Sequence, residues 1–227
     1  MTPSSKNRLM PCHESLFPGD TLFERIARAV CRAGVLPRKE LYEAWEMARR
    51  VRRRYRGGRV VDLACGHGLL ALVMMILDKK SREALAVDTR IPKSAGPLFD
   101  SLCQTWPFLA DQVIYLDRDF NTLTLTGDDL VVSAHACGSL TDDILDLAVG
   151  AGARVAVLPC CHDLDTCDGG NLCAWMAGDL AVDAVRALTL RARGYAVHTA
   201  SIPENITPKN RMLMGAPESR PFPLSSV

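Results

Sequence analysis

The chain has 227 residues, of which 48% are hydrophobic and 23% charged, and its formal net charge is +1. This composition is typical of a globular protein with one substantial domain, and the balanced charge favours no class of partner. The longest apolar run, residues 69–77, is far shorter than the roughly 20 residues that cross a membrane. The polar N-terminus lacks a signal-peptide core, and an odd number of cysteines, nine, argues against a disulfide framework. We therefore expect a cytoplasmic protein with reduced thiols and no membrane contact.

The N-terminal quarter of the chain is expected to be helical. After a loose leader over residues 1–20, apolar residues at helical spacing predict two helices within residues 21–56. We divide the chain into residues 1–57, which hold the leader, these helices and an arginine-rich segment, and residues 58–227, an α/β domain. We expect the helices to pack on that domain.

The rest of the chain alternates between strand and helix patterns. Short apolar runs of this kind are typical of strands covered by helices on both faces. We therefore expect a Rossmann-like, doubly wound α/β sheet, with its ligand site at the carboxyl ends of the strands. The last two strands are too close together for a helix between them, so we expect an antiparallel final strand. The predicted strands are 59–64, 84–88, 112–116, 129–134, 154–158, 195–202 and 211–215, and the predicted helices are 69–78, 92–105, 141–148 and 178–193.

The turn after the first predicted strand carries the main ligand signal. Asp62, Cys65, Gly66 and Gly68 lie between that strand and the next helix, an arrangement that brings backbone N–H groups and a helix N-terminus against a nucleotide-like ligand. The glycines would leave room for the ligand. The carboxylate four residues before the first glycine suits a ligand with an ammonium group, such as S-adenosylmethionine. The alternative is a tight turn in which Asp62 caps a helix.

Two later strand ends add candidate contacts to the same ligand. Asp88 ends the second strand, 20 residues beyond Gly68, where a carboxylate can bind the two ribose hydroxyls of a nucleoside. After the third strand, Asp117 or Asp119 could accept from the adenine amino group while Phe120 packs on the ring, and we favour Asp119. The alternative for Asp88 is a strand-ending acid that caps the next segment. The alternative for the later loop is a solvated Asp119 with Phe120 in the core.

The segment after the fourth strand should lie nearest the reacting centre. It contains His135 and Cys137, and a histidine can act as a general base near neutral pH. We name both as catalytic candidates. The alternative is a helix N-terminus with a hydrogen-bonded histidine and a buried cysteine.

The loops after the fifth and sixth strands are candidate walls of the substrate pocket. Cys160, Cys161 and His162 are expected to bind substrate, with Cys167 and Cys173 as further pocket or core thiols. The alternative is structural zinc, but the spacing departs from paired zinc knuckles, and we expect no metal. Polar residues of the later loop are also candidate substrate ligands, unless that loop is only a rigid hairpin. These residues are Asn205, Lys209 and Asn210.

Arginines are concentrated before the first strand. Arg49, Arg52, Arg53 and Arg56 share one face of the predicted helix, and arginine is suited to bidentate contact with phosphate. RNA is the partner that this face would fit. The alternative is a solvated helix face.

With these residues in view, the chain resembles the class I S-adenosylmethionine-dependent methyltransferases. Residues 62–68 look like their first motif, and Asp88 looks like their second-strand acid. The segments His135-x-Cys137-Gly138 and Pro159-Cys160-Cys161-His162 are similar to a subgroup that includes tRNA 2′-O-methyltransferases and methyltransferase-like proteins of undefined substrate. The chain departs from the tRNA enzymes in having no zinc-finger region, and it lacks the Asn/Asp-Pro-Pro-aromatic motif of amino-group methyltransferases.

The resemblance implies an S-adenosylmethionine-dependent methyltransferase. Its candidate methyl acceptor is RNA, either tRNA or rRNA. Two alternatives stay open. Gly66, Gly68 and Ala71 also satisfy the G-x-G-x-x-A pattern of an NAD-dependent oxidoreductase, although Asp62 counts against it. A non-catalytic RNA-binding or zinc-stabilised adaptor on the same fold is the other alternative.

Overall fold

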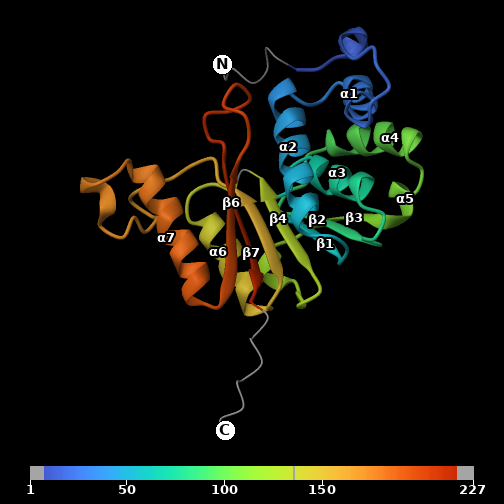
Figure 1. Ribbon diagram of the computed structural model, residues 1–227. Helices are drawn as coiled ribbons and strands as arrows, with labels where there is room; N and C mark the ends of the chain where they lie inside the picture. Colours follow the sequence, from blue (N-terminus) through green and yellow to red (C-terminus); the bar gives the residue numbers. More distant parts are fainter. Residues whose placement is uncertain (1–7, 135, 219–227) are drawn as a thin grey trace.

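A computed structural model describes residues 8–134 and 136–218 and shows one seven-stranded sheet between two layers of helices (Figure 1). The strand order is β3-β2-β1-β4-β5-β7-β6. Strands β1 to β5 are parallel, and β7 runs antiparallel to both of its neighbours. The strands are β1 Val60–Leu63, β2 Ala84–Asp88, β3 Val113–Asp117, β4 Leu130–Ala134, β5 Arg154–Leu158, β6 Tyr195–Ser201 and β7 Arg211–Pro217.

Helix α1, Leu22–Ala33, begins and ends where local sequence signals favour it. Thr21 and Glu24 form a capping box at the N-terminus, and Gly34 ends the helix in the left-handed conformation at φ 67°. The remaining helices follow the sheet connections. They are α2 Arg38–Arg54, α3 Leu69–Leu77, α4 Ala95–Thr105, α5 Leu109–Gln112, α6 Leu140–Gly150 and α7 Gly178–Ala192, with short 3-10 turns η2 Pro11–Leu16, η3 Phe120–Thr122 and η4 Leu172–Ala174.

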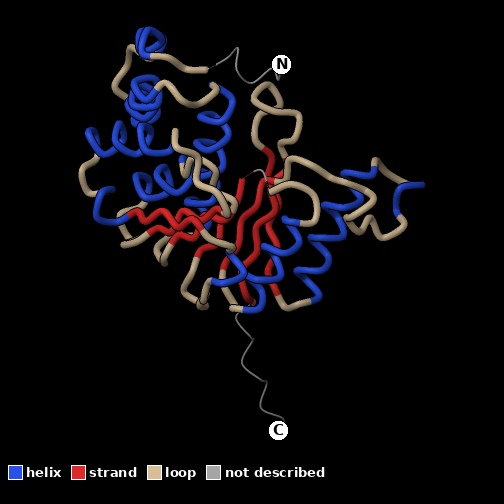
Figure 2. The backbone as a smooth tube through the Cα atoms, turned by 180° about the vertical axis from the view of Figure 1, so that it is seen from behind, coloured by secondary structure: helices blue, strands red, loops and turns tan. Residues whose placement is uncertain are grey.

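Alternate residues of each strand face the two helical layers. On one face, α1 to α5 pack over Val60, Ala86 and Val132, and on the other face α6 and α7 pack over Val61 and Val131. The sheet separates the two layers when it is seen from behind (Figure 2). This is the doubly wound arrangement, and it leaves the loops at the carboxyl ends of the strands free to form a site.

The structure confirms the Rossmann-like sheet, the antiparallel final strand and the helical N-terminal region. The helices α1 and α2 share the core of α3 and α4, so they are part of the same packed unit. One expectation is wrong: the leader is not loose over its described part, because Leu9 and Phe17 are buried against the α1 layer. Within residues 8–134 and 136–218, no helix has both the length and the apolar character needed to cross a membrane.

Candidate active site

The order of the strands identifies the edge that holds the site. The connections from β1 go to one side of the sheet, through β2 and β3, while β4 and β5 lie on the other side. The loops after β1 and β4 therefore diverge, and such a switch point is where ligands bind in open α/β sheets. Asp62, Cys65 and Ala134 line a small pocket there, together with residues contributed by α2 and α3.

Asp62 is a buried carboxyl at the floor of this pocket, and 1% of its surface is exposed. Its Oδ2 accepts a hydrogen bond of 3.1 Å from the backbone N–H of Ala71 in the first turns of α3. Burial raises the pKa of Asp62 to about 8, and the Asp88 charge adds to this rise, while the Ala71 N–H opposes it. The carboxyl therefore partly caps α3, as in the alternative interpretation, and it also faces the pocket.

The turn after β1 has an unusual backbone. Ala64 has a φ of 54°, Gly66 of 53° and Gly68 of 74°. A non-glycine residue in the left-handed region costs of order 1–3 kcal/mol and is found most often at functional sites. No feature of the local sequence signals the strained conformation of Ala64.

Gly66 and Gly68 differ in what surrounds them. A Cβ on Gly66 would have no neighbour within 4 Å, which is consistent with open room for a ligand. A Cβ on Gly68 would lie 2.5 Å from the hydroxyl oxygen of Tyr115, and that hydroxyl donates to the His67 carbonyl over 2.9 Å. The expectation that both glycines leave room for the ligand is therefore right only for Gly66, because Tyr115 fills the space beside Gly68.

Asp88 is joined to this turn. Its Oδ2 accepts from the backbone N–H of Gly66 at 2.9 Å, and its Oδ1 accepts from the N–H of Arg90 at 3.3 Å. The half-buried carboxylate thus lies at the rim of the glycine turn, at the end of the strand beside β1. The ribose contact of Asp88 stays a prediction.

The pocket has a size that suits part of a nucleoside ligand. Its volume is about 50 Å³, and Glu40, Ala44 and His67 complete its wall. The sequence reasoning missed Glu40 and His67, because nothing local links an N-terminal helix with this turn. His67 Nε2 lies 2.9 Å from Ser94 Oγ, and burial lowers the pKa of its imidazole.

Asp119 and Phe120 do not line this pocket. Asp119 Oδ1 accepts from the N–H of Asn121 over 2.9 Å as the cap of η3. Phe120 is 7% exposed and packs in the core beneath α6. The prediction that Phe120 presents its ring to adenine is wrong, because the core buries it.

Three cysteines from two loops meet near the same edge. Cys137 follows β4, and Cys160 and Cys161 follow β5; their Sγ atoms are separated by 3.4, 3.5 and 3.6 Å. Cys167 is buried and contacts Arg186, and Cys173 is exposed, so neither belongs to this trio. His135, the candidate base, lies outside the described residues.

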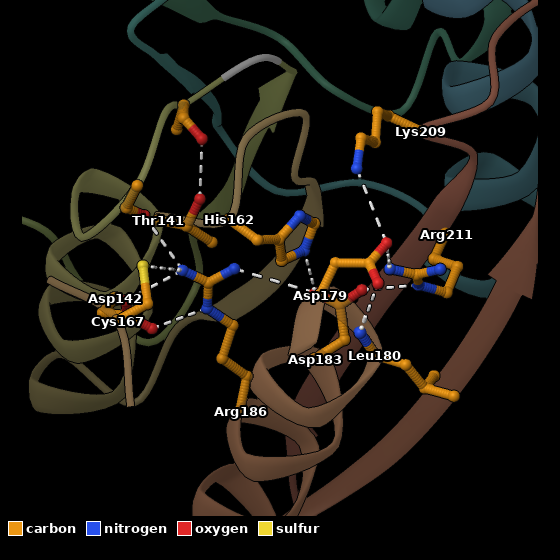
Figure 3. A network of polar contacts seen from close by, with 12 residues as sticks. Thr141, Asp142, His162, Cys167, Asp179, Leu180, Asp183, Arg186, Lys209 and Arg211 are labelled. Carbon is orange, nitrogen blue, oxygen red and sulfur yellow. Dashed lines mark hydrogen bonds and ion pairs between the residues drawn. The ribbon is translucent and has the colours of Figure 1, made fainter. Parts of the chain in front are cut away.

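His162, a predicted substrate-binding residue, has its side chain engaged within the protein. Its side chain is 3% exposed and its Nε2 donates to Asp183 Oδ1 over 2.7 Å (Figure 3). Arg211 donates to the other oxygen of Asp183 over 2.6 Å. Burial alone would raise the pKa of Asp183, but the hydrogen bonds from His162 and Arg211 outweigh burial and lower it. The substrate prediction for His162 is therefore wrong: the ring ties the loop after β5 to α7.

The three candidates in the loop between β6 and β7 have different environments. Asn210 donates its side-chain amide to the Ile202 carbonyl over 3.0 Å and thus holds the hairpin. Lys209 lies 3.5 Å from Asp179 at the edge of the network in Figure 3. Asn205 lines a large cavity and remains available to a ligand.

That cavity lies between the N-terminal segment, α2 and the loop after β6, and has a volume of about 910 Å³. Its wall includes the basic residues Arg8, Arg38 and Lys39. Arg38 also lies over the ring of Tyr42, with its guanidinium carbon 5.3 Å from the ring centroid. Glu40 and Ala44, which line the Asp62 pocket, lie on a different face of α2 from Arg38 and Tyr42, so α2 lies between the two hollows.

The arginine-rich face is not the surface that the sequence predicted. Arg52 is 2% exposed, donates to Met74 O and Ser81 Oγ, and lies 3.2 Å from Asp78. It cannot contact RNA, because the core surrounds it. Arg49 pairs with Glu46 over 3.1 Å, while Arg53 and Arg56 are exposed. These two lie beside the start of β1, at the edge of the sheet opposite the Asp62 pocket.

The fold and the glycine turn with its two flanking carboxylates define a class of nucleoside-binding α/β proteins that includes methyltransferases. A family model described as a methyltransferase domain matches residues 39–166, which is more than half of the chain. The chain belongs to this methyltransferase family, and the match decides against the oxidoreductase alternative. No curated protein matches the chain.

Several solved structures share the fold. A candidate RNA methyltransferase from Pyrococcus horikoshii is 16% identical, with a TM-score of 0.53 over 97% of this chain and 100% of that chain. The S-adenosylmethionine-dependent methyltransferase SibL, in its apo form, is 19% identical, with a TM-score of 0.52. The match covers 94% of this chain and 67% of SibL. An O-methyltransferase family protein from Burkholderia thailandensis is 18% identical, with a TM-score of 0.50. The match covers 92% of this chain and 64% of the Burkholderia protein, so this chain spans less than two thirds of that protein's length.

Proposed function

We propose that the protein transfers a methyl group from S-adenosylmethionine to an RNA acceptor. The observation that carries the cofactor assignment is the turn at Gly66, which has open space in front of it and a carboxylate on each side. Asp88 would bind the ribose hydroxyls, and Asp62 would bind the ammonium group in the small pocket. The cofactor supplies an activated methyl on a sulfonium, which is an excellent leaving group. The protein's main task is therefore to align the acceptor.

The acceptor would approach from the side of the β4 and β5 loops. His135 would orient the acceptor or take its proton, as a histidine can do near neutral pH. Cys137 lies two residues further along the chain, but its thiol is grouped with Cys160 and Cys161.

The acceptor class rests on the large cavity, which α2 separates from the proposed cofactor pocket. Arg8, Arg38 and Lys39 supply positive charge there, and Tyr42 supplies a ring beside Arg38. Basic residues with an interleaved aromatic ring suit a phosphate backbone with unstacked bases. The Pyrococcus horikoshii neighbour, described as a candidate RNA methyltransferase, supports the same acceptor class. Arg53 and Arg56, on the opposite edge, are less suited to guide an acceptor to the methyl group.

Calorimetry and methyl transfer test the two parts of this proposal separately. S-adenosylmethionine should bind and NAD should not, and tritium from the labelled methyl group should enter material that a ribonuclease destroys when total tRNA or rRNA is the acceptor. Binding of the cofactor with transfer only to protein or small molecules would reject the RNA acceptor and keep the methyltransferase. Absence of cofactor binding in the folded protein would reject the proposal as a whole.

Salt dependence identifies the surface. The Arg38→Gln, Lys39→Gln variant should flatten the slope of log K against log salt for tRNA by about 0.7–0.9 for each phosphate group that the protein no longer neutralises. The Arg53→Gln, Arg56→Gln variant removes the same charge from the opposite edge and should keep the wild-type slope. The reverse result would assign RNA binding to the arginine-rich segment.

A further inference from the structure

The three thiols after β4 and β5 form a nearly equilateral triangle. The sides of the triangle are 3.4 Å from Cys137 to Cys160, 3.5 Å from Cys137 to Cys161 and 3.6 Å from Cys160 to Cys161. Three thiolates that bind a tetrahedral Zn²⁺ at about 2.3 Å lie about 3.8 Å from one another. The observed triangle needs to widen by only a few tenths of an ångström to meet this geometry. We propose that Cys137, Cys160 and Cys161 bind one zinc ion.

The backbone on both sides of Cys137 is held in position. Ahead of it, the carbonyl of the buried Ala136 accepts from the hydroxyl of Thr141 over 2.8 Å. After Cys137, the N–H of Gly138 donates to the carbonyl of Cys161 over 3.3 Å, and this hydrogen bond joins the two loops that carry the cysteines. Gly138 has a φ of 57°, a conformation that suits glycine. These hydrogen bonds hold the backbone on each side of Cys137 and join it to the loop that carries Cys161.

A buried arginine from α7 also binds the backbone beside Cys137. Arg186 donates to the carbonyl of Gly138 over 2.9 Å and makes a bidentate pair with Asp142 at 2.7 and 2.9 Å (Figure 3). His162, the residue after Cys161, is bound to Asp183 on the same helix. Figure 3 shows Asp142, His162, Asp183 and Arg186 in one polar network. Through Gly138 and His162, this network holds the residue after Cys137 and the residue after Cys161. Metal sites need such support, because ligand positions must be held to about half an ångström.

Exposure favours a metal site over a cluster of core thiols. Cys137 and Cys161 are exposed and Cys160 is half-buried, so an ion can reach all three sulfurs from solvent. The described residues supply three ligands, and three protein ligands with a fourth position for water or substrate is the pattern of catalytic zinc sites. Cys137 lies three residues beyond Ala134, a wall residue of the Asp62 pocket. The ion would therefore lie on the side from which an acceptor approaches.

The proposal reverses the expectation that the sequence supported. Cys160 and Cys161 are adjacent, and the spacing to Cys167 and Cys173 matches no zinc knuckle, so the linear pattern indicated no metal. The third ligand comes instead from a different loop, 23 residues earlier, which the pairing of β4 with β5 brings alongside.

Cobalt substitution tests the site without any assay of activity. The reduced, chelator-treated protein should bind one Co²⁺ per chain, with the thiolate charge-transfer absorption and the strong visible bands of a tetrahedral site, and one equivalent of Zn²⁺ should remove both. The Cys137→Ser, Cys160→Ser, Cys161→Ser variant should lose these bands. The Cys173→Ser variant changes an exposed cysteine outside the trio and should keep them. Any single substitution in the trio should weaken Zn²⁺ binding at least tenfold.

Alkylation of the wild-type protein gives a second measurement that no folding defect can obscure. One equivalent of Zn²⁺ should protect Cys137, Cys160 and Cys161 from iodoacetamide, while Cys12 and Cys173 react as before. Absence of both the cobalt bands and this protection would overturn the proposal. It would equally be overturned if the reduced trio bound no ion and mass spectrometry found a disulfide between two of its members in the air-exposed protein.

Discussion

The backbone N–H of Gly66 donates a hydrogen bond of 2.9 Å to the carboxylate of Asp88, so the glycine turn after β1 and the acid that ends β2 form one structural unit. Any change at Asp88 therefore affects both the ligand contacts proposed for it and the shape of the turn. The choice of variant decides which of the two effects is measured.

We expect Asp88→Ala to weaken S-adenosylmethionine binding at least tenfold. The substitution removes two charge-assisted hydrogen bonds to the ribose, each worth about 1.5–3 kcal/mol. Asp88→Asn keeps an oxygen that can accept from Gly66 and should show a smaller loss. Calorimetric titration measures both affinities, and Asp111→Ala, which removes an exposed carboxylate of α5, is the control. Unchanged affinity in folded Asp88→Ala protein would contradict the ribose assignment.

The two glycines of the turn should respond differently to alanine. Gly66→Ala should fold with a loss of about 1–2 kcal/mol from its left-handed backbone, because a Cβ there meets nothing, and it should bind the cofactor more weakly. Gly68→Ala should lose stability further, since its Cβ would overlap the Tyr115 ring. Urea unfolding measures the first effect and calorimetry the second. Equal stability of the two variants would show that Tyr115 moves aside easily.

The stability of the ligand-free protein should fall as pH rises between about 4 and 8 because of Asp62. The pKa of this carboxyl is raised to about 8 in the folded state by burial, against about 3.9 in an unfolded chain. In this window the unfolded chain has lost the proton and the folded chain has kept it, so each rise in pH favours unfolding by up to about 1.4 kcal/mol per unit. The free energy of unfolding of wild type minus that of Asp62→Asn, from urea melts at about pH 5 to 8, should decline over the range. A constant difference would rule out the raised pKa.

Cofactor binding should release a proton through the same group. Below pH 8 the free carboxyl is protonated, whereas an ammonium partner favours the carboxylate. Titrations near pH 7 in two buffers of different ionisation enthalpy should show proton release by wild type that is absent in Asp62→Asn. Identical release by both proteins would assign the proton to another group.

Replacing Arg52 should affect stability rather than RNA binding. Arg52→Leu leaves the buried carboxylate of Asp78 without its closest guanidinium, a loss of about 3–5 kcal/mol for a buried ion pair broken on one side. Arg53→Leu, one position along the helix and exposed, should cost less than about 0.5 kcal/mol. Urea unfolding compares the two, and similar losses would argue against the burial of Arg52.

The short-range features of the chain were predictable from sequence because neighbouring residues alone determine them. Short apolar runs and helical patterns predicted the strands and helices within a few residues, and the short gap before the last strand predicted an antiparallel return. Asp62, Gly66 and Asp88 could be named as candidate ligand residues because a strand, a turn and the end of the next strand have a fixed spacing in a parallel sheet.

Only the tertiary structure decided which side chains share an environment. It inserted β7 between β5 and β6, buried Arg52 against Asp78 and filled the space beside Gly68 with Tyr115. It buried Phe120 in the core and His162 against Asp183. It also brought Cys137 to Cys160 and Cys161. The amino-acid pattern could not show these outcomes, because each depends on contacts between residues far apart in the chain, and strand pairing and core packing determine those contacts rather than local chain geometry.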